Sequence, residues 1–283
     1  MSRLSAATSR LTGAIALLAL VIPGAGSAQT PVILEEDVIF SRTLGSAVLA
    51  DIAYPVDGME LPVIMYVHGG RWRAGARVNN AGLKVAQWAG LGFFAMTIDY
   101  RLVGASPAPA AYQDVQTAIR WVHAHADEYG IDPDRIYLIG NSSGGHLVAL
   151  AATLGEGPYE RVGGWEDARS DVRAVISAAG PYDLNTLSWG NLWTPVGGDV
   201  WEARRLASPI HHIGPGTKPI LVVHSDDDRS VPIDQAVDMA AALEAANVLH
   251  RFVHYEDRGH MSVTDEVIEH TLAFIAEVEG RKW

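Results

Sequence analysis

The sequence contains no cysteine, and this absence excludes several kinds of chemistry. Disulfide bonds, thiolate nucleophiles and cysteine-ligated metals are impossible within these 283 residues. Basic residues are also scarce, since 21 Lys and Arg stand against 33 Asp and Glu, for a net charge of -12. Nucleic acids and anionic membrane surfaces repel a chain of this charge, so we expect neither as a partner.

Long hydrophobic runs are missing too, apart from one near the N-terminus. Residues 11–22 are apolar but too few to span a bilayer comfortably, and they follow Arg3 and Arg10. A run of small residues then ends at Ala28. This order is typical of a secretory signal peptide, so residues 1–28 are expected to be removed on export to the periplasm or the medium. An uncleaved membrane anchor is the alternative; otherwise we expect no stable membrane insertion after processing.

Strand-like and helix-like stretches alternate along the remaining chain, residues 29–283. This alternation predicts a parallel sheet with helices on both faces, and the uniformly apolar strands fit a sheet that is buried on both sides. Residues 36–54 are expected to form two opening strands around Gly45, and residues 181–215, rich in Trp, Pro and Gly, to be irregular. Further strands are predicted at 62–67, 93–98, 135–139, 172–178, 219–223 and 249–254, and helices at 80–90, after Pro109, after Gly144, at 233–246 and at 263–279.

The strongest chemical signal is Gly140-Asn141-Ser142-Ser143-Gly144, which fits G-x-S-x-G. A strand precedes this motif and a helix follows it, so Ser142 stands at a sharp turn with an exposed hydroxyl. We predict Ser142 as a nucleophile, while Ser143 contributes its N–H to an oxyanion and not its hydroxyl. A glycine-rich turn without function is the alternative. His146, four residues on, is expected to be a structural hydrogen-bonding residue.

A serine hydroxyl needs a base, and His260 is the best-placed candidate. It lies in a loop between the last strand and the last helix, which suits the chain order Ser, acid, His. The acid is expected after the strand at 219–223, where three adjacent aspartates could orient the histidine. The residues alone do not choose among them, because turn formation explains the others equally well. The three candidates are Asp226, Asp227 and Asp228.

His68-Gly69-Gly70-Arg71-Trp72 follows a strand one strand–helix–strand unit before the nucleophile. Glycines let backbone N–H groups face a substrate oxygen, so this loop could form the second side of an oxyanion hole. A plain Gly-Gly turn is the alternative.

Together these motifs resemble the α/β-hydrolase superfamily, in particular hormone-sensitive-lipase-like esterases and bacterial feruloyl and acetylxylan esterases. The resemblance implies a mostly parallel eight-stranded sheet with helices on both faces and a small cap insertion at about 181–207. It runs from about Val63 to His260 and rests on His68-Gly69-Gly70, Asp99-Tyr100-Arg101-Leu102, Asp114, Tyr129-Gly130-Ile131-Asp132-Pro133, Gly140 to His146, Ser208-Pro209-Ile210, Val231-Pro232 and Gly259-His260.

The resemblance also implies roles for single residues. Laid on this sequence, the family pattern H-G-x-x-D-x-x-V-P makes Asp228 the triad acid, with Asp227 next. Many relatives carry a third glycine where this chain has Arg71, and alanine where it has Ser143. The oxyanion donors carry over to Gly69, Gly70 and Ser143. Aromatic residues are expected to wall the substrate pocket, with packing of the cap as the alternative; these are Trp72, Tyr182, Trp189 and Trp193.

These patterns predict a serine carboxylic ester hydrolase that acts through an acyl-enzyme, without metal or organic cofactor, on a small-molecule ester of short-chain or aryl type. The alternatives are an arylformamidase or other amidase, or an exopeptidase, of the same fold, because the His-Gly-Gly-x-Trp form is also similar to that of kynurenine formamidases. A non-catalytic binding module is the third hypothesis. The sequence does not select among cell-wall, short-chain lipid and xenobiotic esters, and it carries no signal for an oligomeric state.

Overall fold

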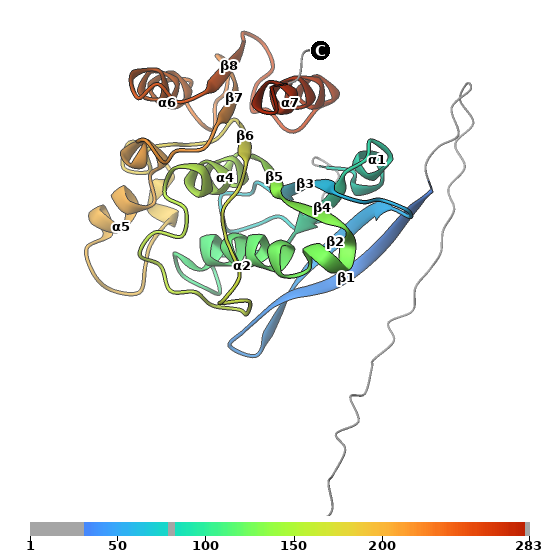
Figure 1. The fold of residues 1–283 in the computed structure, drawn as a ribbon. Coiled ribbons are helices and arrows are strands. Elements are labelled where there is room, and N and C mark those ends of the chain that lie inside the picture. The colour runs from blue at the N-terminus through green and yellow to red at the C-terminus, as the bar shows by residue number, and fades with distance from the viewer. Residues whose placement is uncertain (1–30, 79–82, 281–283) are drawn as a thin grey trace, which may run out of the picture.

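The computed structural model describes residues 31–78 and 83–280, so the expected signal peptide lies outside the described residues. The described residues form one eight-stranded sheet in the order β1-β2-β4-β3-β5-β6-β7-β8 (Figure 1). β2 pairs antiparallel with β1 and β4, and the other neighbours are parallel. The predicted α/β-hydrolase architecture is therefore confirmed.

The elements follow one another in the expected alternation. The strands are β1 (Val32–Thr43), β2 (Ser46–Pro55), β3 (Leu61–Val67), β4 (Phe94–Ile98), β5 (Ile131–Asn141), β6 (Ala174–Ala178), β7 (Ile220–Ser225) and β8 (His250–Tyr255). The helices of the described residues are α1 (Val85–Gly90), α2 (Ala110–Ala124), α3 (Ala126–Tyr129), α4 (Ser143–Thr153), α5 (Val200–Leu206), α6 (Asp234–Ala245) and α7 (Asp265–Val278), with short 3-10 turns η1 (Gly190–Leu192) and η2 (Pro209–His212).

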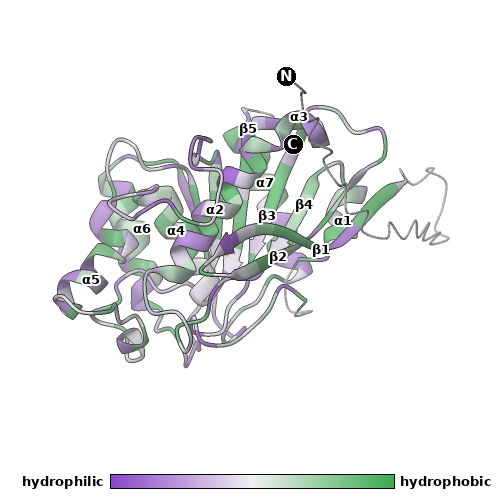
Figure 2. Cartoon of the chain, turned by 90° about the horizontal axis from the view of Figure 1, so that it is seen from below, coloured by the Kyte–Doolittle hydropathy of each residue, from purple (hydrophilic) through white to green (hydrophobic). Residues whose placement is uncertain are grey.

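The sheet separates two hydrophobic cores, because side chains alternate between its faces. On β3, Val63 and Met65 belong to the core beneath α2, α4 and α6, whereas Ile64 and Tyr66 belong to the core beneath α1 and α7. Both faces are thus covered, which is why the parallel strands are apolar throughout. In Figure 2, β3 and β4 carry mostly hydrophobic colour, whereas the helices mix both colours.

The segment between β6 and β7 differs from the expectation of irregular structure. It contains α5, whose start is capped by the Asp199 side chain accepting from the N–H groups of Trp201 and Glu202. None of the residues of α5 is buried. The helix therefore lacks the amphipathic pattern that would have revealed it.

The parallel strands bring distant loops to one edge of the sheet. β3 ends just before His68, β5 just before Ser142, and β7 just before the three aspartates. β8, next to β7, leads into the loop that carries His260. Because the carboxyl ends of parallel strands share an edge, the residues predicted for the triad and the oxyanion hole meet there.

Candidate active site

The turn at Ser142 connects β5 directly to α4. Its backbone has φ 55° and ψ -125°, a conformation that is costly for a residue with a Cβ atom. The N–H of Ser142 donates to the carbonyl of Ala178 on the neighbouring strand at 2.8 Å, which helps hold the strained turn. The strain places the serine at the apex between strand and helix, as the G-x-S-x-G pattern predicts.

The two glycines of the motif are required by close backbone packing. A Cβ atom on Gly144 would overlap the carbonyl oxygen of Val67, at the end of β3. One on Gly140 would lie 2.5 Å from the carbonyl oxygen of Gly144. Glycine at 144 therefore lets the turn approach the end of β3, and glycine at 140 lets the turn close on itself.

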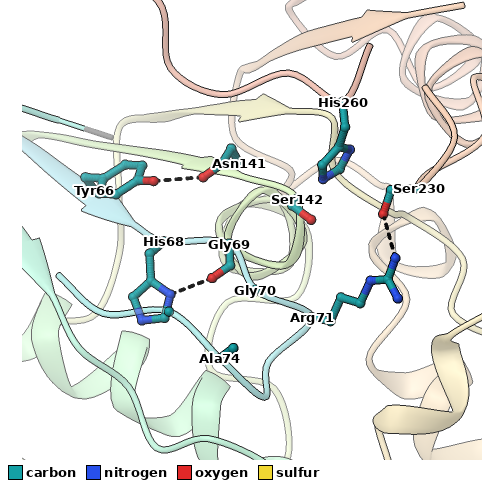
Figure 3. Close-up of a pocket in the computed structure, with 11 residues that line it drawn as sticks. Tyr66, His68, Gly69, Gly70, Arg71, Ala74, Asn141, Ser142, Ser230 and His260 are labelled. Carbon is teal, nitrogen blue, oxygen red and sulfur yellow. Dashed lines mark hydrogen bonds between the residues drawn. The ribbon is translucent and has the colours of Figure 1, made fainter. Parts of the chain in front are cut away.

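His260 and Asp228 are hydrogen-bonded. Nδ1 of His260 lies 2.7 Å from Oδ2 of Asp228, whose side chain is fully buried, while the His260 side chain is about one-third exposed. Figure 3 shows the ring of His260 close to Ser142 at the cavity. Both residues line the same cavity, although none of the hydrogen bonds of the described residues joins them. Such bonds often tighten only when substrate is bound.

The other oxygen of Asp228 is also satisfied. It accepts from the backbone N–H groups of Ser230 at 2.8 Å and Val231 at 3.0 Å. Burial opposes ionisation, but hydrogen bonds from His224, His260 and this backbone outweigh it and hold the pKa of Asp228 well below its usual range. The acid thus stays a carboxylate, the form that can orient an imidazole.

The neighbouring aspartates have separate partners. Asp227 accepts from the Ser225 hydroxyl and from the N–H of Gly259, both at 2.7 Å, so it anchors the loop that carries His260. Asp226 lies 2.6 Å from His254 on the surface. The geometry therefore associates Asp228, and neither neighbour, with His260.

A second histidine contacts the acid, and sequence reasoning missed it. Nε2 of the buried His224 lies 2.9 Å from the carbonyl oxygen of Val231 and 3.3 Å from Oδ2 of Asp228. Because a carbonyl only accepts, this nitrogen carries the proton and donates. His224 occupies the first position of the H-G-x-x-D pattern, which was the available signal.

The loop after β3 faces the nucleophile turn. A Cβ on Gly69 would lie 3.0 Å from the carbonyl oxygen of Asn141, and Gly70 has φ +121°. The His68 ring stacks on Tyr100 with centroids 4.1 Å apart, and its Nδ1 lies 2.6 Å from the Gly69 carbonyl oxygen. Burial lowers the pKa of His68, so the ring stays neutral and supports the loop without adding charge.

Gly69 and Gly70 line the cavity beside Ser142, whereas Ser143 is fully buried behind it. The Ser143 hydroxyl lies 3.4 Å from that of Tyr100 and so faces away from the cavity. Its N–H belongs to the first residue of α4, where helical N–H groups have no partner within the helix. The three predicted donors therefore lie around the nucleophile.

The aromatic residues predicted for the pocket lie elsewhere. Trp72, Tyr182 and Trp193 are at most 1% exposed and Trp189 is 7% exposed. Trp72 packs against Trp189 and Trp193 with ring centroids 4.9 and 5.4 Å apart, and Tyr182 hydrogen-bonds Ser177 at 2.8 Å. None of the four is among the described residues that line the cavity, because they pack the β6–β7 segment onto α4 and the oxyanion loop.

The cavity itself is small. Its volume is about 560 Å³, within the usual range for small-molecule sites. The residues that line it are Tyr66, His68, Gly69, Gly70, Arg71, Ala74, Gly75, Asn141, Ser142, Ser230 and His260 (Figure 3).

Two features are absent from the described residues, 31–78 and 83–280. No group of three or more His, Asp or Glu side chains gathers there in a way that could hold a metal ion. Nor does that part of the chain contain a helix of sufficient length and apolarity to cross a membrane.

A strained serine turn between strand and helix, a histidine–aspartate pair and a glycine loop on a mostly parallel sheet define the α/β-hydrolase class. Within that class the chain belongs to the BD-FAE family, whose model matches residues 50–243. The matched region includes Ser142 and Asp228 and ends before His260.

Individual relatives agree with this assignment. A probable carboxylic ester hydrolase of Mycobacterium tuberculosis, LipM, is 33% identical over 62% of this chain and 43% of its own. A truncated carbohydrate esterase from gut microbiota has a TM-score of 0.74 at 27% identity, covering 90% of this chain and 99% of that one. An esterase of Thermogutta terrifontis has a TM-score of 0.72 at 25% identity, covering 85% and 91%. The chain spans about half the length of the curated relatives it matches.

Proposed function

We propose that this protein is a serine carboxylic ester hydrolase that acts through an acyl-enzyme. The observation that carries the proposal is the 2.7 Å bond between His260 and the buried carboxylate of Asp228, at one cavity with the strained Ser142. The esterase names of its relatives point the same way.

In the proposed reaction the oxygen of Ser142 attacks the ester carbonyl while Nε2 of His260 takes its proton. Asp228 holds the proton on Nδ1, which leaves Nε2 free to act as the base. The negative oxygen of the tetrahedral intermediate accepts hydrogen bonds from the N–H groups of Gly69, Gly70 and Ser143. His260 then gives its proton to the leaving alcohol, and water, activated by the same ring, releases the acid.

His224 is the positioning residue of this arrangement. Its Nε2 donates to the Val231 carbonyl and lies 3.3 Å from the oxygen of Asp228 that also binds His260. The carboxylate therefore cannot rotate without losing two side-chain contacts and its two backbone donors. A fixed acceptor keeps the His260 ring in one orientation.

The substrate we propose is a small ester with a short acyl chain or an aryl alcohol. A cavity of about 560 Å³ holds a small molecule.

A labelling experiment tests the nucleophile. The wild-type chain should react with a fluorophosphonate probe and hydrolyse p-nitrophenyl acetate, and Ser142→Ala should lose both. Ser143→Ala keeps its backbone donor and should still be labelled. Labelling that survives in Ser142→Ala would refute the mechanism. Turnover of formylkynurenine or aminoacyl anilides well above that of esters would instead indicate an amidase.

We also propose that the protein is exported to the periplasm or the medium after loss of residues 1–28. The basic start, short apolar run and small-residue stretch support this. Mass spectrometry of the chain expressed in a Gram-negative host should find the N-terminus at Gln29 in the periplasmic or extracellular fraction. Recovery of intact chain in the membrane fraction would favour the uncleaved anchor.

A further inference from the structure

Arg71 occupies an unusual position beside the nucleophile. It follows Gly70 directly and has φ 56°, and Trp72 after it has φ 57°. Two consecutive non-glycine residues in the left-handed region are rare and need support from their surroundings. This backbone buries Trp72 in the core, while Arg71 stays exposed and lines the cavity.

The guanidinium group of Arg71 extends toward Ser230, another residue that lines the cavity. Its carbon lies 5.4 Å from the ring centroid of Trp189, and Nη2 lies 3.4 Å from the hydroxyl of Ser230 (Figure 3). Trp189 is itself fixed, because its Nε1 donates to the Ser230 carbonyl at 2.8 Å. The aromatic face and the hydroxyl therefore hold a cation in place without neutralising it.

The permanent charge at the cavity is positive, although the whole chain is strongly acidic. Among the described residues that line it, Arg71 alone has a permanent charge, and no carboxylate faces it there. None of the salt bridges of the described residues involves Arg71. Asp228, the nearby acid, is buried and already hydrogen-bonded to His260.

We propose that Arg71 is a specificity-determining residue that binds a carboxylate carried by the ester substrate. The bond to Ser230, 3.4 Å long and with a neutral partner, is weak. A carboxylate can accept two parallel hydrogen bonds from a guanidinium, and charge-assisted bonds of this kind are about twice as strong as neutral ones. A carboxylate on the substrate therefore forms a stronger hydrogen bond with Arg71 than the Ser230 hydroxyl that it replaces. This inference rests on the proposed esterase function and names its substrate class.

Matched esters test the proposal, with a carboxamide as the neutral isostere of each carboxylate. Monomethyl glutarate against methyl 4-carbamoylbutanoate places the charge on the acyl side, and 4-acetoxybenzoate against 4-acetoxybenzamide places it on the alcohol side. The wild type should favour the carboxylate by about tenfold in kcat/KM in one of the two pairs. Arg71→Gln should bring that ratio close to one, and the preference should shrink at high salt.

Arg73→Gln is the control, because it removes the same charge from an exposed residue that does not line the cavity. It should keep the wild-type ratio. A wild-type ratio near one in both pairs would overturn the proposal, and so would a ratio that Arg71→Gln leaves in place.

Binding without turnover separates this inference from the esterase function. Calorimetry with glutarate and 4-hydroxybenzoate on Ser142→Ala should detect one of these anions, and Ser142→Ala/Arg71→Gln should bind it at least several-fold more weakly. Binding that depends on Arg71 in a protein that hydrolyses no ester would reject the function and keep the anion site. Ester hydrolysis without any Arg71-dependent preference or binding would keep the function and reject the site.

Discussion

Acidification should destabilise this protein through one buried side chain, His146 on α4. Trp72 Nε1 donates to Nδ1 of His146 at 3.2 Å, and Nε2 of the same ring lies 2.6 Å from the carbonyl oxygen of Ala207. Since an indole N–H only donates and a carbonyl only accepts, the neutral ring with its proton on Nε2 satisfies every partner. A second proton would have to enter Nδ1, facing the Trp72 donor.

Burial, only partly offset by the bond to Ala207, lowers the pKa of His146 from 6.5 to about 4. His146 therefore binds a proton near pH 6.5 in the unfolded chain but only near pH 4 in the folded chain. The free energy of unfolding falls as the pH drops between these two values. The loss begins at about pH 6.5 and is complete below about pH 4. At 1.36 kcal/mol per pH unit the full loss is about 3 kcal/mol, and about 2 kcal/mol of it is reached by pH 5.

Urea unfolding at pH 8 and pH 5 measures this loss. His146→Gln and His146→Met should both be less stable than the wild type at pH 8, because each disturbs the contacts of Trp72 and Ala207. Neither can titrate there, so the difference in unfolding free energy from the wild type should narrow by about 2 kcal/mol at pH 5. A difference that stays constant between the two pH values for both variants would refute the reasoning.

Three further predictions concern the catalytic loops. Asp228→Asn should lower kcat by a factor of about 10³ to 10⁴, because the amide favours the wrong tautomer of His260. Asp226→Asn at the surface should retain the wild-type kcat. Equal effects of the two variants in a steady-state ester assay would contradict the assignment of Asp228 as the triad acid. Asp227→Asn should lower kcat more than it raises KM, since it weakens the anchor of the histidine loop, and an unchanged kcat would mean that the anchor is dispensable. Gly144→Ala should cost about 3 kcal/mol of stability, measured by denaturant unfolding, because its Cβ meets backbone that cannot move away. The Cβ of Gly90→Ala points into open space, so this variant should be close to neutral.

The positions of the buried strands along the chain and the place of the nucleophile follow from local patterns. Uniformly apolar runs identified the buried parallel strands, and the G-x-S-x-G turn between strand and helix identified Ser142. Both signals reside in neighbouring residues and can be read without knowing the fold. Helix α5 was not predicted, because a short helix without buried residues leaves no periodic pattern in the sequence.

Contacts between distant segments were decided only in three dimensions. Asp226, Asp227 and Asp228 are chemically alike and adjacent, so only the direction in which the loop after β7 turns could assign one to His260 and another to Gly259. The positions of the four aromatic residues expected at the pocket were likewise decided only by tertiary contacts.

By itself, the sequence identified a serine, a histidine and an aspartate as the residues that could supply the chemistry. Tertiary structure alone decided that the aromatic rings pack behind the cavity and that Arg71 faces into it. The physical reason is that the turn motif and the strand and helix patterns depend on a residue and its near neighbours. The side of a loop on which a group emerges depends instead on backbone angles, such as the left-handed pair at 71 and 72, that packing with distant strands and helices imposes.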